Sequence, residues 1–233
     1  MKKNTEPFPN KITGEAMKEN KLFNRSVLFV GDSLCEAYCE KTVPELAEKA
    51  GWAGRIMVAN NMSGINKSLG GASMSDCRGE NIVLKQLIEM TGNKYDYLIL
   101  EGGGNDAWDS APVGKMTEGF DGPFDRTTFA GGLENTFKYA KDNFPDSVFG
   151  FIVTFRMPAA QFGRMSDMSE YFALSKAICE KWGIPYLDLF FNDEFNENLL
   201  KTHLRDNLPD TIHPNTAGYD IITPFVEDWM KTL

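Results

Sequence analysis

The stretch Ser26-Val27-Leu28-Phe29-Val30-Gly31-Asp32-Ser33-Leu34 decides the fold class of this 233-residue chain. Its first five residues form an apolar run without alternation, as expected for a strand that is covered on both faces. A glycine and two polar residues follow at once, which is typical of a loop. We therefore predict a buried parallel strand over residues 26–30.

Four further apolar runs predict strands at residues 55–59, 96–100, 148–154 and 185–188. Helix-length amphipathic stretches alternate with these runs. Helices are expected from Ser75, as the N-cap, toward Gly92, and over residues 129–140, 168–182 and 221–230. This alternation predicts a mostly parallel sheet between layers of helices.

The chain length fits one large domain, which we place at residues 25–233 after a polar N-terminal arm at residues 1–24. The 42% of hydrophobic residues supply material for its core. The longest irregular segment runs from Gly102 to Asp125, and long loops of this kind are often functional.

Composition excludes several classes of function. The chain has 33 acidic and 24 basic residues, a net charge of −9, which argues against a nucleic-acid partner because phosphate backbones are bound by basic surfaces. No apolar run approaches the roughly 20 residues that cross a bilayer. Charged residues such as Glu6 interrupt the apolar region of a signal peptide. The four cysteines form no C-x-x-C pair, so we expect reduced thiols and a cytoplasmic location.

Parallel sheets place ligands at the carboxyl ends of their strands, so the loops that follow the strands are the first candidates for a site. Ser33 lies in the loop after the first strand. It is either the N-cap of a helix or a nucleophile, and a nucleophilic serine requires a base.

Only two histidines, His203 and His213, are available as that base. His213 lies in Asp210-Thr211-Ile212-His213-Pro214, where the Asp210 carboxylate can fold back and fix the tautomer of the imidazole. His203 lies in a polar stretch near Asp206 and reads as an exposed surface residue. We therefore favour His213.

Two loops contain candidate donors for an oxyanion. The glycines of Leu69-Gly70-Gly71-Ala72-Ser73 allow a backbone N–H to approach a substrate oxygen. The loop Gly102-Gly103-Gly104-Asn105-Asp106 adds the side-chain amide of Asn105. Tight turns are the alternative explanation for both glycine runs.

With these loops in view, the chain resembles the SGNH/GDSL superfamily of esterases, lipases and acylhydrolases. The resemblance covers residues 31–215 and rests on four landmarks in the family's order. They are Gly-Asp-Ser-Leu at 31–34, Asn-Lys-Ser-Leu-Gly-Gly at 66–71, Gly-Gly-Asn-Asp at 103–106 and Asp-x-x-His-Pro at 210–214.

The resemblance implies a three-layer α/β/α sandwich with a flavodoxin-like five-stranded sheet. It implies Ser33 as nucleophile, His213 as base and Asp210 as the residue that orients it. The oxyanion donors are then the N–H groups of Ser33 and Gly71, with Gly71 fitting better than Gly70, and the Asn105 side chain. The activity it implies is hydrolysis of carboxylic esters through an acyl-enzyme, with no metal or organic cofactor.

Three other functions compete with this hypothesis. A dinucleotide-binding module is suggested by Gly102-x-Gly104-x-x-Ala107, but such a motif opens into a helix, and the residues after it are expected to break one. An α/β-hydrolase requires a G-x-S-x-G elbow, which the sequence lacks. A catalytically silent ligand-binding protein on the same scaffold is the third.

The substrate is predicted to be a short-chain or acetyl ester of a carbohydrate or small molecule, with longer acyl chains, as in a lipase or lysophospholipase, as the alternative. Candidate substrate contacts are Trp108, Phe155, Arg156 and Met157. Each has a structural alternative: Trp108 fills its loop, Phe155 and Met157 cap the core, and Arg156 pairs with an acidic side chain.

Overall fold

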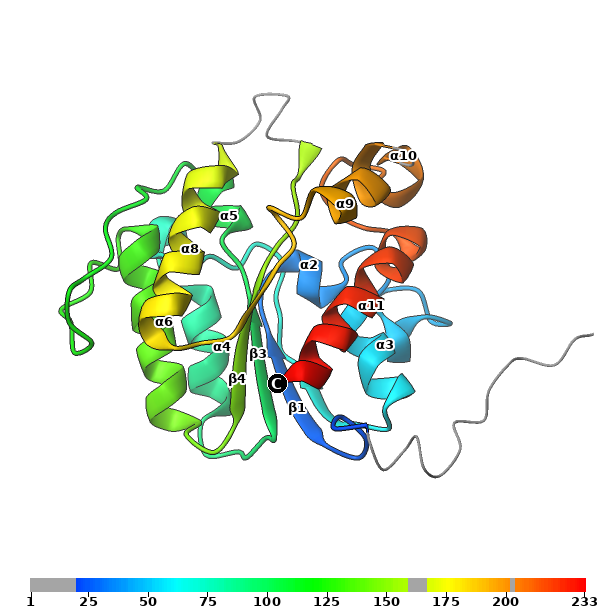
Figure 1. Cartoon of the computed structure of the whole chain (residues 1–233), viewed down its shortest axis with the longest axis horizontal. Helices are drawn as coiled ribbons and strands as arrows, with labels where there is room; N and C mark the ends of the chain where they lie inside the picture. The colour runs from blue at the N-terminus through cyan, green and yellow to red at the C-terminus, as the bar shows by residue number, and fades with distance from the viewer. Residues whose placement is uncertain (1–19, 159–166, 202–203) are drawn as a thin grey trace, which may run out of the picture.

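The computed structural model describes residues 20–158, 167–201 and 204–233. Its centre is a five-stranded parallel sheet in the order β2-β1-β3-β4-β5 (Figure 1). The strands are β1 (Ser26–Val30), β2 (Ser63–Asn66), β3 (Tyr97–Glu101), β4 (Val148–Val153) and β5 (Tyr186–Asp188). This flavodoxin-like order confirms the predicted fold class.

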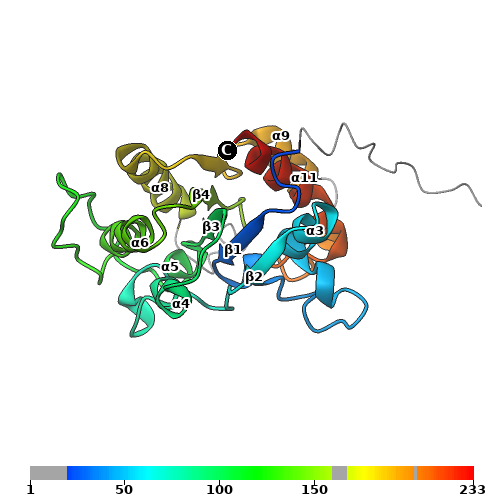
Figure 2. The same cartoon turned by 90° about the horizontal axis from the view of Figure 1, so that it is seen from below.

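Helices cover both faces of the sheet, as two perpendicular views show (Figures 1 and 2). One layer holds α4 (Ile82–Met90), α6 (Phe129–Asn143) and α8 (Met168–Trp182), and the other holds α3 (Gly51–Ala59) and α11 (Thr216–Thr232). The shorter elements are α2 (Ser33–Glu36), η1 (Ala47–Lys49), η2 (Asp76–Arg78), α5 (Gly104–Trp108), α9 (Asp193–Asn196), η3 (Glu197–Lys201) and α10 (Leu204–Asn207). None of the described helices combines the length and apolar character needed to span a membrane.

The central strands are buried because helices pack on both of their faces. Leu28 of β1 pairs with Leu98 of β3, which pairs with Phe149 of β4. The ring of Phe137, on α6, packs edge-on against Phe149 and Phe151, each with ring centroids 5.4 Å apart. This packing fixes the register of the strands whose ends carry the candidate site.

The predicted strand at residues 55–59 is wrong, because these residues belong to α3. A short apolar run does not distinguish a strand from a buried helix, and here Trp52 and Ile56 face the core from one side of a helix. The true second strand, β2, lies at the edge of the sheet and is mostly exposed. It therefore carries no apolar run that the sequence reveals.

The predicted helix start at Ser75 is also wrong. Ser75 caps the short helix η2, where its side chain accepts the N–H of Cys77. The longer helix α4 begins later, with the Asn81 side chain accepting the N–H of Leu84 at 2.8 Å. The helices predicted over 129–140, 168–182 and 221–230 are confirmed as parts of α6, α8 and α11.

The predicted polar arm, residues 1–24, lies mostly outside the described residues. The described part, residues 20–24, forms a turn in which Leu22 is buried. His203 likewise lies outside the described residues.

Candidate active site

Ser33 is the first residue of α2, just past the carboxyl end of β1. The N-cap of this helix is Asp32, whose carboxylate accepts the N–H of Leu34 at 2.9 Å. The structural alternative for Ser33, a role as N-cap, is therefore taken by its neighbour. The Ser33 hydroxyl is left for another partner.

That partner is His213, which is 180 positions away in the sequence. Its Nε2 lies 2.8 Å from the Ser33 Oγ, and its Nδ1 lies 2.6 Å from Oδ2 of Asp210. The other Asp210 oxygen accepts the backbone N–H groups of Ile212 and His213 at 2.9 and 2.7 Å. The three side chains predicted to act together thus form one continuous chain of hydrogen bonds.

The electrostatics of Asp210 keep it charged. Burial alone would raise its pKa, but the hydrogen bonds from the His213 ring and from two backbone N–H groups outweigh burial and hold the pKa below its usual value. A charged carboxylate at Nδ1 holds that nitrogen as the protonated one, so that Nε2 faces Ser33 as an acceptor.

The turn that carries Asp210 and His213 is strained. Thr211, a β-branched residue, has a φ of 71°, and its hydroxyl is buried with no hydrogen-bond partner among the described residues. Strain of this kind persists where surrounding contacts determine the backbone, and it clusters at functional sites. No sequence pattern predicts it.

Tyr38 is a site residue that the sequence did not reveal. Its ring packs against the His213 ring with centroids 4.9 Å apart, and about half of the residue is exposed. It forms a wall on one side of the imidazole. The only sequence signal is its place five residues after Ser33.

The sequence predicts two backbone N–H groups as oxyanion donors, those of Ser33 and Gly71. The N–H of Gly70 already donates to Oε2 of Glu36 at 2.8 Å. By contrast, the N–H groups of Ser33 and Gly71 donate to no group within the described residues. Gly71 has a φ of 81°, which favours glycine, so this geometry supports Gly71 over Gly70 as the donor.

Arg78 connects this loop to the next one, and the sequence analysis missed it. Its Nη1 donates to the Gly71 carbonyl at 3.0 Å, while its Nε and Nη2 contact the Asp109 carboxylate. Asp109 caps the C-terminal end of α5, the helix that carries Asn105. Arg78 therefore ties both candidate oxyanion loops together.

The Asn105 side chain joins three loops at the carboxyl end of the sheet. Its Nδ2 donates to the Ala72 carbonyl at 3.0 Å and to Oδ2 of Asp32 at 3.2 Å. Asn105 itself belongs to the short helix α5, which ends at Trp108, the first of the residues expected to break a helix. The prediction of an irregular segment from Gly102 to Asp125 is wrong for residues 104–108, which form this helix.

The four predicted substrate contacts lie in different environments. Trp108 is 39% exposed at the end of α5, whereas Phe155 is fully buried and Met157 is 5% exposed. The Arg156 guanidinium pairs with Asp193 at 2.6 Å. These positions favour the structural alternatives for Phe155, Met157 and Arg156, and leave Trp108 accessible.

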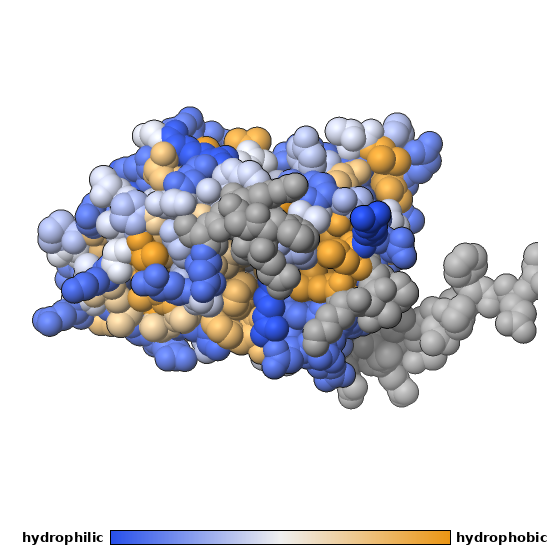
Figure 3. Space-filling model, turned by 90° about the horizontal axis from the view of Figure 1, so that it is seen from above, coloured by the Kyte–Doolittle hydropathy of each residue, from blue (hydrophilic) through white to orange (hydrophobic). Residues whose placement is uncertain are grey.

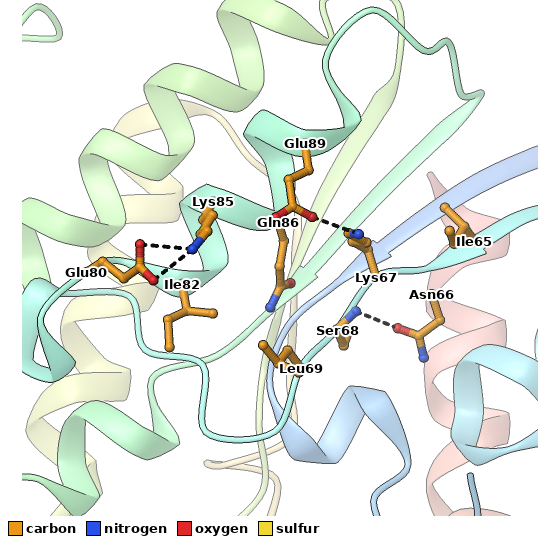
Figure 4. Close-up of a pocket in the computed structure, with 10 residues that line it drawn as sticks. All are labelled: Ile65, Asn66, Lys67, Ser68, Leu69, Glu80, Ile82, Lys85, Gln86 and Glu89. Atoms are coloured by element: carbon orange, nitrogen blue, oxygen red, sulfur yellow. Dashed lines mark hydrogen bonds and ion pairs between the residues drawn. The ribbon is translucent and has the colours of Figure 1, made fainter. Parts of the chain in front are cut away.

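The carboxyl-end face of the sheet displays apolar surface between polar regions (Figure 3). A separate pocket of about 540 Å³ lies between the edge strand β2 and α4, beside the segment that leads into the oxyanion loop (Figure 4). Its Gln86 exchanges two hydrogen bonds with the backbone of Gly31, at 3.1 and 2.9 Å. Ser33 and His213 do not line this pocket.

No cluster of three or more potential metal ligands occurs within the described parts of the chain.

The model of the GDSL-like lipase/acylhydrolase family matches residues 29–221. The chain belongs to this family. This GDSL-like protein is therefore a serine hydrolase that acts on carboxylic esters. No curated protein is significantly similar to it.

Solved structures share the fold of this GDSL-like protein. One is a member of the lipolytic protein G-D-S-L family from Veillonella parvula DSM 2008, with 16% identity, a TM-score of 0.65, and coverage of 89% of this chain and 99% of the other. Another is the psychrotrophic esterase EstA from Pseudoalteromonas sp., inhibited by monoethylphosphonate, with 16% identity, a TM-score of 0.57, and coverage of 89% and 97%.

Proposed function

We propose that the protein hydrolyses carboxylic esters in two steps, with Ser33 as nucleophile, His213 as base and Asp210 as its orienting partner. The observation that carries this proposal is the hydrogen-bond chain from Ser33 Oγ to His213 Nε2 (2.8 Å) and from His213 Nδ1 to Asp210 (2.6 Å). The first distance lies within the range required for proton transfer from a nucleophile to its base, and the second is that of a hydrogen bond which orients the base.

In the first step, Ser33 Oγ attacks the ester carbonyl carbon while its proton passes to Nε2 of His213. The tetrahedral intermediate collapses as the protonated imidazole gives this proton to the leaving alcohol, which forms an acyl-serine. In the second step, His213 takes a proton from water, the hydroxide attacks the acyl carbon, and the proton returns to Ser33 as the acid leaves. Asp210 stabilises the imidazolium in both steps.

The negative oxygen of the intermediate is held by the N–H groups of Ser33 and Gly71 and by the Asn105 side chain. The two backbone groups have no acceptor among the described residues, so binding an oxygen breaks no hydrogen bond that they make there. The Asn105 amide is oriented by its hydrogen bonds to Ala72 and Asp32. In this proposal the oxyanion is a second acceptor for one of these two N–H groups.

The substrate we propose is a short-chain or acetyl ester of a carbohydrate or small molecule. Two exposed aromatic side chains support this choice: Tyr38, stacked on the base, and Trp108, three residues after Asn105. Aromatic rings of this kind provide a flat, amphipathic surface for a sugar or a small alcohol. The second candidate, a longer acyl ester, is favoured by the exposed Leu69 beside the oxyanion loop.

A chain-length series tests both parts of the proposal. We expect hydrolysis of p-nitrophenyl acetate and butyrate, and of an acetylated sugar, to exceed that of the C8 and C12 esters in kcat/KM. A Ser33→Ala variant should lose this hydrolysis at every chain length. A maximum at C8 or C12 would select the lipase alternative, and undiminished turnover by the alanine variant would refute the proposed nucleophile.

A further inference from the structure

Two carboxyl side chains are buried next to the nucleophile, and the reaction described above gives Glu101 no role. Asp32 directly precedes Ser33, and Glu101 is the last residue of β3; their exposed fractions are 1% and 0%. The backbone N–H of Asp32 donates to Oε2 of Glu101 at 3.4 Å, which places the Glu101 carboxyl group beside Asp32. No amide, amine or hydroxyl of the described residues donates to Oε1 of Glu101.

The nucleophile loop is shaped to make room for Glu101. A Cβ atom at Gly31 would lie 2.9 Å from the Glu101 carbonyl oxygen and 3.0 Å from its Oε2. Any larger residue at position 31 would therefore push this carboxyl group away. The glycine that opens the Gly-Asp-Ser-Leu motif thus permits the contact between Asp32 and Glu101.

A hydrogen bond between two carboxyl groups requires one proton. No lysine or arginine within the described residues pairs with either group, and two adjacent carboxylates cannot both remain charged in a buried site. Asp32 already uses both oxygens as acceptors, Oδ1 for the Leu34 N–H and Oδ2 for the Asn105 amide. This arrangement leaves Asp32 as the carboxylate and Glu101 as the acid that donates.

The groups around Glu101 also favour its protonated form. Burial, followed by the charge of Asp32, raises the pKa of Glu101 well above its usual value. The other titratable groups that face the pair are Cys35 on α2, Asp106 on α5, Tyr219 on α11 and His213. Burial also raises the pKa of the Cys35 thiol, so this thiol stays neutral beside the pair.

We propose that Glu101 is a protonated positioning residue, whose O–H holds Asp32 so that Asp32 holds the Asn105 side chain at the oxyanion site. This inference rests on the proposed function, because it assigns Glu101 to the same reaction. A neutral acid is required there: a second negative charge would lie beside an oxygen that becomes negative in the transition state.

A matched pair of variants separates the hydrogen bond from the space that Glu101 fills. Glu101→Gln keeps the shape and keeps a donor toward Asp32, so we expect kcat within about threefold of the wild type. Glu101→Met has a similar size but no donor, so we expect kcat to fall roughly 10-fold or more, with KM within about twofold. Glu134→Gln is the control, since Glu134 is equally buried but pairs with Lys181 away from the site.

Infrared difference spectra report the proton directly and need no catalytic activity. The wild type minus Glu101→Gln spectrum at pH 7 should contain the carbonyl band of a protonated carboxylic acid, and the wild type minus Glu134→Gln spectrum should lack it. Absence of the first band, unchanged kcat in Glu101→Met, or equal losses in the Gln and Met variants would overturn the inference. If any of these results is found while Ser33→Ala is inactive, only the role of Glu101 is refuted. If Ser33→Ala is active, the proposed function itself is refuted.

Discussion

The Nε2 atom of His213 lies 2.8 Å from the Oγ of Ser33, although the two residues stand at opposite ends of the chain. Ser33 follows the first strand of the sheet, and His213 precedes the last helix. Their contact exists only because the parallel sheet brings the loop after β1 next to the turn that leads into α11.

Replacing the orienting carboxylate tests the tautomer of the base. In Asp210→Asn the side chain keeps its shape but no longer stabilises an imidazolium or selects the Nδ1–H tautomer. We expect kcat to fall by about 10²- to 10⁴-fold, with KM nearly unchanged. Asp206→Asn, a change in the nearby helix α10, is the control and should keep wild-type kinetics. Equal kinetics for both variants would remove Asp210 from the mechanism.

Removing the side-chain donor tests the oxyanion site. Asn105→Ala should reduce kcat by about 10²- to 10³-fold, which corresponds to roughly 3 to 4 kcal/mol of transition-state stabilisation. Removal of one oxyanion donor has an effect of this size in other enzymes. Steady-state kinetics on p-nitrophenyl acetate measure the effect. Asn93→Ala removes a side chain that donates to the Met90 carbonyl at an exposed turn, and this variant should behave like the wild type. A loss confined to KM would indicate that Asn105 binds substrate without stabilising the transition state.

The connection between the two oxyanion loops gives a third prediction. Arg78→Lys cannot hold the Asp109 carboxylate and the Gly71 carbonyl at once, because a lysine ammonium lacks the planar fork. We expect kcat to fall roughly 10-fold, since loops displaced by a fraction of an ångström misplace their donors. The matched control is Arg126→Lys, which alters the neighbouring pair with Asp76. If both variants retain wild-type kcat, Arg78 does not position the loop.

The fourth prediction concerns stability and pH. The buried Glu40 carboxylate accepts both guanidinium Nη groups of Arg55, at 2.5 and 2.9 Å, and the Gly51 N–H at 2.8 Å. Burial alone would raise the pKa of Glu40, but these hydrogen bonds hold it below the usual value of 4.5. An acid with a lowered folded-state pKa stabilises the protein above its unfolded-state value and loses that contribution as pH falls through the folded-state value.

Glu40→Gln should therefore lower the free energy of unfolding by about 3 kcal/mol at pH 7, because Arg55 loses its buried partner. The difference between wild type and variant should shrink as pH falls below about 4.5, where the Glu40 carboxylate of the unfolded chain begins to gain its proton before that of the folded protein does. Urea unfolding at a series of pH values measures both quantities. A difference that stays constant down to pH 3 would show that the charge of Glu40 is not what stabilises the fold.

The sequence by itself determined the elements that are buried on both sides and the motifs that are local. The runs at residues 26–30, 96–100 and 148–154 predict strands because a central strand must be apolar on both faces. The turn that joins Asp210 to His213 spans four residues, so the spacing alone suggests their contact. The edge strand β2 gave no such signal, because its exposed face permits polar residues and glycine.

Tertiary structure decided which polar groups meet. The sequence places Ser33 and Glu101 at the ends of two strands, but only the pairing of β1 with β3 brings Glu101 against Asp32. The same is true of Arg78, whose contacts with Gly71 and Asp109 depend on how two loops pack. The sequence alone does not show whether a carboxyl or guanidinium group is solvated or buried. Its protonation and its role follow from the neighbours that folding supplies.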